Sequence, residues 1–150
     1  MKINFIYATY SGTTSQMVDD ALNILSKMNI VANKILLDES FQLSDLNHND
    51  MLIFATPSWF DSGLDGQPHT SFISFMNKNS KSDFSEYKTA FIGLGDNTYA
   101  RFCRGIDIVE DYFTSRGASK ISDTLKLDSY QFDMEKGRVD LEKWINSLPL

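Results

Sequence analysis

The sequence has a single cysteine, two isolated histidines and no long apolar run. One cysteine, Cys103, excludes an internal disulfide and indicates a reducing compartment such as the cytoplasm. His48 and His69 are expected to be surface or loop residues, and we predict no metal site because no Cys/His cluster has ligand spacing. No stretch of about 18 apolar residues is present, so we predict no membrane span. The first residues also lack the basic and apolar regions of a signal peptide.

The chain has fewer basic than acidic residues, with 14 Lys and Arg against 20 Asp and Glu, which gives a net charge of −6. This balance argues against nucleic acid, whose phosphates would be repelled. It favours partners with a basic face, although it also suits solubility alone. The 150 residues, with 42% apolar and 23% charged side chains, predict one globular domain over residues 1–150.

Apolar runs alternate with amphipathic segments along the chain. The runs predict strands at Lys2–Ala8, Val31–Leu37, Asp50–Thr56, Lys88–Leu94 and Ser122–Leu127. The segments predict helices at Thr14–Met28, Thr70–Asn77, Arg104–Arg116 and Glu135–Leu148, with Gly117 as a C′ residue and a single helical turn around Leu43 and Leu46. Such alternation predicts a doubly wound α/β fold, a parallel sheet with helices on both faces.

Three motifs that mark other α/β proteins are missing. No Gly-x-Gly-x-x-Gly follows the first predicted strand, which excludes a dinucleotide-binding Rossmann domain, and no Gly-Lys-[Ser/Thr] indicates a P-loop nucleotidase. Ala8 and Thr9 stand where a response-regulator receiver has an acidic pair, and Thr56 stands where it has an aspartate.

Hydroxyl side chains concentrate in the first loop, Thr9-Tyr10-Ser11-Gly12-Thr13-Thr14, between a predicted strand and a predicted helix. The free N–H groups of the first helical turn and the positive end of the helix dipole meet there, so the loop suits an anion such as a phosphate. The loop contains no lysine or arginine. The same residues also suit an ordinary helix cap.

Two further loops follow the third and fourth predicted strands, at residues 56–63 and 95–103. Each offers an aromatic side chain, Trp59 or Tyr99, beside small or acidic residues. Because ligands bind at the carboxyl ends of strands in open α/β sheets, a phosphate-bearing molecule with a flat ring would fit between them. Alternatively, each aromatic packs on the protein itself.

Taken together, these loops resemble those of the short-chain flavodoxins, over essentially the whole chain. The first loop matches [Thr/Ser]-x-[Thr/Ser]-Gly-x-Thr, the second matches a Thr-Pro-Thr-Trp type of loop as Thr56-Pro57-Ser58-Trp59, and the third matches Gly-Asp-x-x-Tyr-x-x-Phe-Cys from Gly95 to Cys103. The resemblance implies a flavodoxin-like three-layer α/β/α sandwich with a five-stranded parallel sheet in the order 2-1-3-4-5. It also implies non-covalently bound FMN.

The same resemblance implies roles for particular residues. The first loop would hold the phosphate, Ser58 would reach the phosphate or ribityl chain, Trp59 and Tyr99 would cover the two ring faces, and Gly95 with Asp96 would line the pyrimidine edge. The implied cofactor-binding residues are Thr9, Tyr10, Ser11, Gly12, Thr13, Thr14, Thr56, Pro57, Ser58, Trp59, Phe60, Gly63, Gly95, Asp96, Tyr99, Phe102 and Cys103.

The implied activity is low-potential one-electron transfer between redox proteins with basic docking faces, such as a ferredoxin/flavodoxin reductase, by a monomer. The alternative is an FMN-dependent reductase acting on a small substrate such as a quinone. Asp61, Asp65 and Asp96 would disfavour an anionic reduced flavin, and Arg101 and Arg104 would oppose this effect. Phe60 stands where many flavodoxins have glycine or asparagine, so we expect weaker stabilisation of the one-electron-reduced cofactor.

Two expectations concern residues outside these roles. Cys103 is expected to be a small buried core residue rather than a reactive thiol. The carboxylates of Asp19, Asp20, Glu110 and Asp111 lie on predicted helices and are expected on solvated faces.

Overall fold

The computed structural model describes residues 2–61 and 63–150. Its strands are β1 (Ile3–Tyr7), β2 (Ala32–Leu36), β3 (Met51–Pro57), β4 (Trp59–Asp61), β5 (Leu64–Gln67), β6 (Lys88–Gly95), β7 (Ser119–Lys120) and β8 (Leu125–Asp128). Its helices are α1 (Thr13–Lys27), α2 (Thr70–Lys78), α3 (Arg104–Ser115) and α4 (Met134–Ser147), with a 3₁₀ turn η1 (Leu43–Asp45). The predicted helices and the first four predicted strands are confirmed to within a residue at each end.

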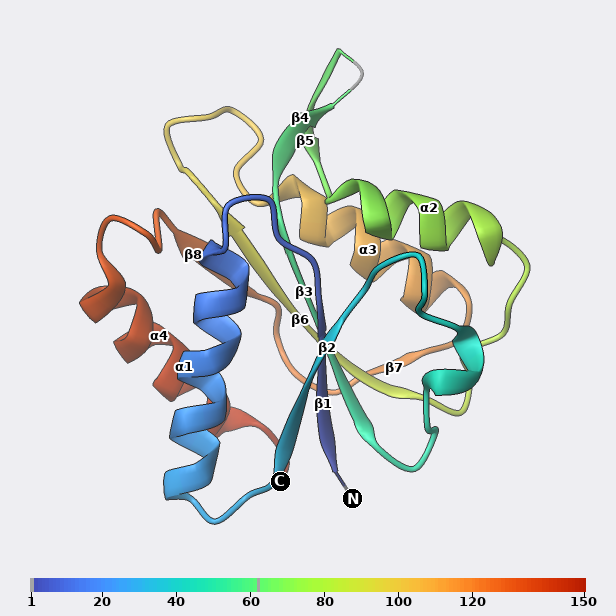
Figure 1. The fold of residues 1–150 in the computed structure, drawn as a ribbon, viewed down its shortest axis with the longest axis horizontal. Coiled ribbons are helices and arrows are strands. Elements are labelled where there is room, and N and C mark those ends of the chain that lie inside the picture. Colours follow the sequence, from blue (N-terminus) through green and yellow to red (C-terminus); the bar gives the residue numbers. More distant parts are fainter. Residues whose placement is uncertain (1, 62) are drawn as a thin grey trace.

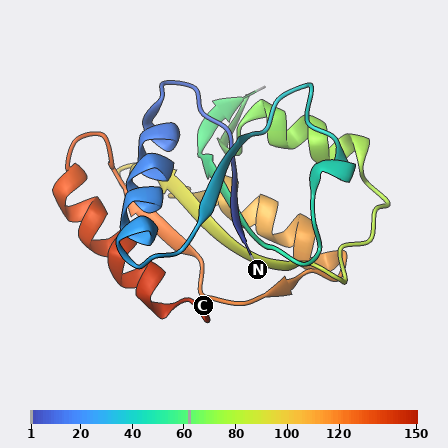
Figure 2. The ribbon, with the colours of Figure 1, turned by 60° about the horizontal axis from the view of Figure 1, so that its bottom comes forward.

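The main sheet is parallel and runs in the order β2-β1-β3-β6, after which β7 and β8 both pair with β6. This confirms the predicted order 2-1-3-4-5, with two short strands sharing the fifth position. Helices α1 and α4 cover one face of the sheet and α2 and α3 the other, as Figures 1 and 2 show from two directions. The three-layer α/β/α sandwich is therefore confirmed.

Each face of the sheet has its own hydrophobic core. Under α1 and α4 it includes Met17, Leu25 and Trp144, whereas under α2 and α3 it is mainly aromatic. There the Phe54 and Phe113 rings stack with centroids 4.1 Å apart. Residues 51–56 of β3 are all buried, as expected of a strand covered on both faces. In the described part of the chain, no helix combines the length and apolarity needed to cross a membrane.

The parallel register brings the loops of the site to one edge. Ala55 of β3 lies beside Tyr7 of β1, and Gly95 of β6 lies beside Asp128 of β8. The carboxyl ends of these strands therefore lie at the same edge, at the top of Figure 1, and both chain termini lie at the opposite edge. The loops that follow β1, β3, β6 and β8 meet there.

The loop predicted at residues 56–63 contains structure that the sequence pattern did not indicate. Strands β4 and β5 form an antiparallel hairpin that projects from the edge of the main sheet (Figure 1). Its side chains Trp59, Phe60 and Leu64 are exposed. A hairpin of such short, exposed strands lacks the buried alternation by which strands are recognised.

The fifth predicted strand, Ser122–Leu127, is confirmed only in its second half, because β8 begins at Leu125 and residues 122–124 lie in no strand. Side chains of α3 and α4 bond to residues 123 and 124 of this segment. The indole Nε1 of Trp144 donates to the carbonyl oxygen of Asp123 at 2.7 Å, and the hydroxyl of Thr124 is bonded to Glu110. The bond from Trp144 thus satisfies a backbone carbonyl that lies outside the sheet.

Asp20 corrects the expectation that the helical carboxylates are solvated. It is only 7% exposed on α1 and accepts hydrogen bonds from Tyr130 and from Gln16, while the Nε of Arg138 lies 3.1 Å from its Oδ2. Tyr130 lies in the loop after β8, and Arg138 lies on α4. The buried carboxylate therefore connects α1, α4 and the fourth loop at the site edge.

Candidate functional site

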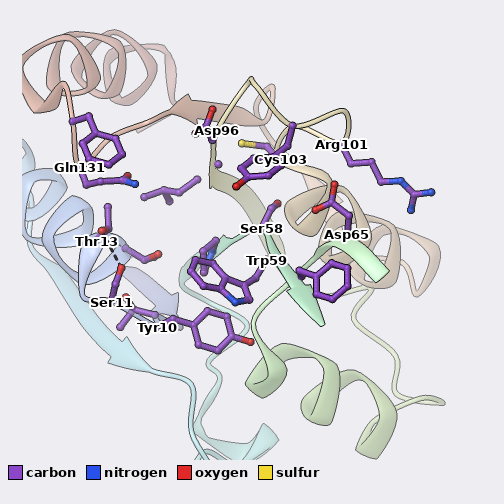
Figure 3. A pocket seen from close by; sticks show the side chains of 18 residues that line it. Tyr10, Ser11, Thr13, Ser58, Trp59, Asp65, Asp96, Arg101, Cys103 and Gln131 are labelled. Carbon is purple, nitrogen blue, oxygen red and sulfur yellow. Dashed lines mark hydrogen bonds between the residues drawn. The ribbon is translucent and has the colours of Figure 1, made fainter. Parts of the chain in front are cut away.

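A cavity of about 470 Å³ opens at the carboxyl edge of the sheet. Figure 3 shows its walls, which come from the loops after β1, β3, β6 and β8 and from the β4–β5 hairpin. Its lining consists of Thr9, Tyr10, Ser11, Thr13, Thr14, Pro57, Ser58, Trp59, Phe60, Asp65, Leu94, Gly95, Asp96, Tyr99, Arg101, Cys103, Gln131 and Phe132. The volume lies within the usual range for pockets that hold drug-sized ligands and cofactors.

The first loop turns sharply into α1 at Gly12, whose φ of 91° favours glycine. The Gly12 N–H donates to Oγ1 of Thr9 at 2.9 Å, and the hydroxyls of Ser11 and Thr13 lie 3.3 Å apart. The first turn of α1 contains no acidic residue. Hydroxyls and the positive end of a 15-residue helix therefore meet at one wall of the cavity, without a carboxylate to repel an anion.

Aromatic side chains form the opposite part of the cavity and remain exposed. Trp59 is 53% exposed and Tyr99 is 63% exposed, although both line the cavity. Tyr10 lies between the hydroxyl-rich wall and the hairpin, with its ring centroid 5.3 Å from that of Trp59. These aromatic faces suit a flat, apolar ring system, because covering them with a ring is energetically favourable.

Ser58 connects the second loop to α3. Its Oγ accepts the N–H of Gly105 at 2.8 Å, and its own N–H donates to the carbonyl of Leu94. A side chain at position 105 would collide with Ser58 and Pro57, so glycine permits this close approach. Thr56 is fully buried, and its Oγ1 accepts the N–H of His69 at 2.9 Å. Thr56 thus holds the residue that precedes α2 and does not line the cavity.

The third loop is fixed by its own hydrogen bonds. Oδ1 of Asp96 accepts the backbone N–H and the hydroxyl of Thr98, and these bonds lower the pKa of Asp96 below its usual value. The N–H of Asn97 donates to Asp128 at 3.0 Å, which ties the loop to β8. Asp96 is therefore ionised at neutral pH at the cavity wall.

Cys103 is fully buried, with φ at 51°, and begins the turn into α3. Burial raises the pKa of its thiol to about 12. The thiol is protonated at neutral pH and the residue is buried, so the expectation of a core residue rather than a reactive thiol is confirmed.

Asp65 and Arg101 place opposite charges at the rim of the cavity. In Figure 3 the Arg101 side chain extends outward past Asp65, away from the hydroxyl-rich wall. Gly66 lies beside them with φ at 70°, and a Cβ there would come within 2.9 Å of the Arg101 Cβ. Negative and positive charge thus lie side by side where the cavity opens.

Most of the residues predicted from the sequence line this one cavity, but Gly12, Thr56, Gly63 and Phe102 do not. The sequence pattern missed Leu94, Gln131 and Phe132, and did not assign Asp65 or Arg101 to the site. Gln131 and Phe132 belong to the loop after β8. That loop was predictable, because it follows the fifth strand and must reach the same edge as the other three.

Comparison with known proteins agrees with this geometry. The sequence model of the flavodoxin family matches residues 5–140. The MioC homolog of Haemophilus influenzae is 38% identical over 69 residues, 46% of this chain and 46% of that protein. A flavodoxin of Maridesulfovibrio salexigens is 27% identical over 125 residues, 82% of this chain and 83% of that one.

Among solved structures, a Fusobacterium nucleatum flavodoxin bound to flavin mononucleotide superimposes with a TM-score of 0.77 at 21% identity, over 97% of this chain and 95% of that one. This likeness concerns the fold. The family match covers nearly the whole sequence, and the three loop motifs lie together around one cavity. The chain therefore belongs to the flavodoxin family.

Proposed function

We propose that residues 1–150 act as one FMN-binding domain, and that the protein is a one-electron carrier between redox proteins. The observation on which this depends is a single cavity that joins the N-terminus of α1 and its hydroxyls to exposed Trp59 and Tyr99. A phosphate fits the first wall and a tricyclic ring fits the second. Family membership supports the same cofactor.

The hydrogen bonds of the described residues fit a phosphate ligand. The hydroxyl oxygens of Thr9 and Ser58 already accept backbone N–H groups, from Gly12 and Gly105. Each O–H remains able to donate, which is what an anion requires. Ser11, Thr13 and Thr14 add further hydroxyls at the start of α1. The phosphate would thus be held by hydrogen bonds and the helix dipole, without a counter-charge in the loop.

When bound, FMN supplies the electron-carrying chemistry, and the protein sets how readily it is reduced. Asp65 and Asp96 line the cavity, and negative charge near the ring disfavours an added electron. Arg101 opposes this but extends outward (Figure 3). We therefore propose a low reduction potential.

The proposed partners are redox proteins with basic docking faces, such as a ferredoxin/flavodoxin reductase, which the protein meets as a monomer. The net charge of −6 speeds encounter with such faces through long-range attraction. Trp59, Phe60, Tyr99 and Phe132 leave apolar surface exposed around the cavity mouth for short-range contact. The cytoplasmic location indicated by the single cysteine stays a prediction.

The proposal is tested with purified protein. We expect a yellow protein, or an apoprotein that binds one FMN per chain, with the chromophore identified after release. The reduced protein is then mixed separately with NADH, quinones and a ferredoxin-type reductase. Exchange with the protein partner alone supports the carrier. Turnover with small molecules alone indicates an FMN-dependent reductase, and failure to bind FMN overturns the proposal.

A separate prediction concerns Phe60, which lies in the extended backbone of β4. A glycine after Trp59 would allow positive φ at that position, and its carbonyl could then turn toward a protonated nitrogen of a bound flavin. Phenylalanine resists that conformation by roughly 1–2 kcal/mol. We expect Phe60→Gly to raise the potential of the first one-electron step by about 40–90 mV.

Anaerobic reductive titration followed by visible spectra measures this change. Phe60→Ala is the matched control, since it removes the ring but keeps the β-carbon that disfavours positive φ. An equal shift in both variants would show that the side chain, rather than the backbone, is responsible.

A further inference from the structure

His69 lies at a junction of three segments of the site. Its backbone N–H donates to Oγ1 of Thr56, at the end of β3. Its Nδ1 accepts the N–H of Ser71 at 3.0 Å, which caps the start of α2. Its ring stacks on Tyr10 of the first loop, with centroids 4.0 Å apart, and faces the backbone of Thr9. This arrangement is more specific than the surface or loop position expected from the sequence.

Tyr10 completes a second connection between the same segments. Its hydroxyl oxygen accepts the N–H of Thr70 at 3.1 Å, so Tyr10 contacts both His69 and the residue after it. On its other side, the Tyr10 ring lies 5.3 Å from Trp59. A line of contacting rings therefore runs from His69 through Tyr10 to Trp59, from the start of α2 into the cavity.

We propose that His69, as a neutral imidazole, is a positioning residue that fixes the first loop and Tyr10 for cofactor binding. The proposal rests on the proposed function, that is, on FMN binding in this cavity. A neutral imidazole has one acceptor nitrogen and one donor nitrogen. His69 uses the acceptor for the Ser71 N–H and leaves the other nitrogen for the backbone of Thr9. Protonation removes the acceptor, so a charged imidazole cannot accept the Ser71 N–H and the cap of α2 is lost.

The surroundings of His69 favour the neutral form. Burial lowers the pKa of His69 below its usual value, against the opposing effect of its hydrogen bond to the Thr9 backbone. The positive end of α2 disfavours a second positive charge there. Among the described residues that contact the imidazole, Tyr10 is titratable, whereas Thr9 and Ser71 carry no charge.

The sign of the pH effect follows from this lowered pKa. An unfolded or released histidine binds a proton near pH 6.5, and the positioned one does so only at lower pH. The positioning contribution is therefore complete above about pH 6.5. It is lost as the pH falls from there through the lowered pKa.

The test compares FMN dissociation constants of the wild-type protein and His69→Asn between about pH 5 and pH 8. Asparagine can still cap α2 through its side-chain oxygen, but it neither stacks on Tyr10 nor titrates. We expect the variant to bind FMN about five- to tenfold more weakly above pH 6.5, in line with the loss of the ring contact with Tyr10. The dissociation constant of the variant divided by that of the wild-type protein should fall toward one as the pH approaches about 5.

The FMN phosphate titrates equally in both measurements, so its effect drops out of this ratio. Riboflavin, which lacks the phosphate, provides an independent check. His48→Gln is the matched control, because His48 is exposed and is the other histidine of the chain. It should follow the wild-type profile. His69→Phe keeps a ring against Tyr10 but loses the cap, and it should also bind more weakly at neutral pH.

The outcomes separate the two proposals. If the wild-type protein binds neither FMN nor riboflavin, the proposed function fails, and this inference fails with it. If the wild-type protein binds FMN and the His69→Asn ratio is one, or does not change with pH, the positioning role of the neutral imidazole is overturned while the FMN function stands.

Discussion

Replacing Thr13 with glutamate is expected to abolish tight FMN binding and to leave the fold intact. Thr13 is the first residue of α1 and lines the hydroxyl-rich wall of the cavity. A carboxylate about 5 Å from a phosphate costs about 3 kcal/mol per unit charge at an effective dielectric of about 20. A phosphate monoester bears about 1.5 to 2 negative charges, so FMN affinity should fall more than about 10³-fold.

The size of this effect follows from how the site is built. The first loop contains no lysine or arginine that could offset the new charge. The phosphate would be held only by hydroxyls, N–H groups and the dipole of α1, and a carboxylate at the first helical position would compete for all three. A protein that bound phosphate through a basic side chain would lose much less.

The same substitution is not expected to unfold the protein. The first turn of α1 contains no acidic residue, and a glutamate at a helix N-terminus stabilises the helix by about 0.3–1 kcal/mol. Thermal unfolding of the apoprotein should therefore be unchanged or slightly raised. Thr13→Gln is the neutral control of the same length, and it should retain most of the FMN affinity.

Riboflavin distinguishes a local effect from a general one. Because it lacks the phosphate, its affinity should be similar in the wild-type protein and in Thr13→Glu. Fluorescence quenching of both flavins measures the two constants. Equal FMN affinity in the glutamate and glutamine variants would contradict a phosphate site at the start of α1.

How far the sequence predicts this site depends on where each residue lies. Thr9–Thr14, Trp59 and Tyr99 follow strands with clear apolar runs, so the direction of a parallel sheet alone places them together. The helix start at Thr13 was also predictable, because Gly12 and the hydroxyls precede a regular apolar stripe. Local pattern and general topology were sufficient for these residues.

The parts that were missed depend on contacts distant in the sequence. The hairpin β4–β5 is short and exposed, so no burial pattern indicates it. Asp20 follows Asp19 in a polar pair that is typical of a solvated helix face, and its hydrogen-bond partner Tyr130 lies 110 residues away. His69 has no local feature that indicates stacking on Tyr10, 59 positions earlier. Such pairs become visible only when the chain is folded.

Gly137→Ala is expected to destabilise the protein by about 2–3 kcal/mol, although glycine to alanine normally stabilises a helix interior by about 1 kcal/mol. Gly137 is buried on α4, and a Cβ there would lie 2.4 Å from Cδ2 and 2.6 Å from Cε2 of Tyr130. Tyr130 is 1% exposed, so its ring is enclosed by the closely packed interior.

The Tyr130 ring is also held at its far end. Its hydroxyl donates to the buried carboxylate of Asp20, which Arg138 contacts as well, and burial raises the pKa of the Tyr130 hydroxyl. A shift of the ring would leave a polar pair imperfectly bonded in the interior, which adds to the cost of the collision. The methyl group therefore cannot be accommodated by a small rotation of one side chain.

A double-mutant cycle with Tyr130→Ala tests this explanation. Tyr130→Ala should itself be destabilising, but adding Gly137→Ala to it should be neutral or slightly stabilising, because the colliding ring is gone. Urea unfolding of the four proteins gives the free energies. If Gly137→Ala destabilises equally with and without the Tyr130 ring, the collision is not the cause.

The cycle also reports on the cofactor site. Gln131 and Phe132 follow Tyr130 directly and line the cavity (Figure 3). A displaced Tyr130 should move this fourth loop, so Gly137→Ala should weaken FMN binding as well as stability, although it lies outside the cavity lining. Unchanged FMN affinity in a destabilised Gly137→Ala protein would show that the loop after β8 keeps its position independently of the Tyr130 ring.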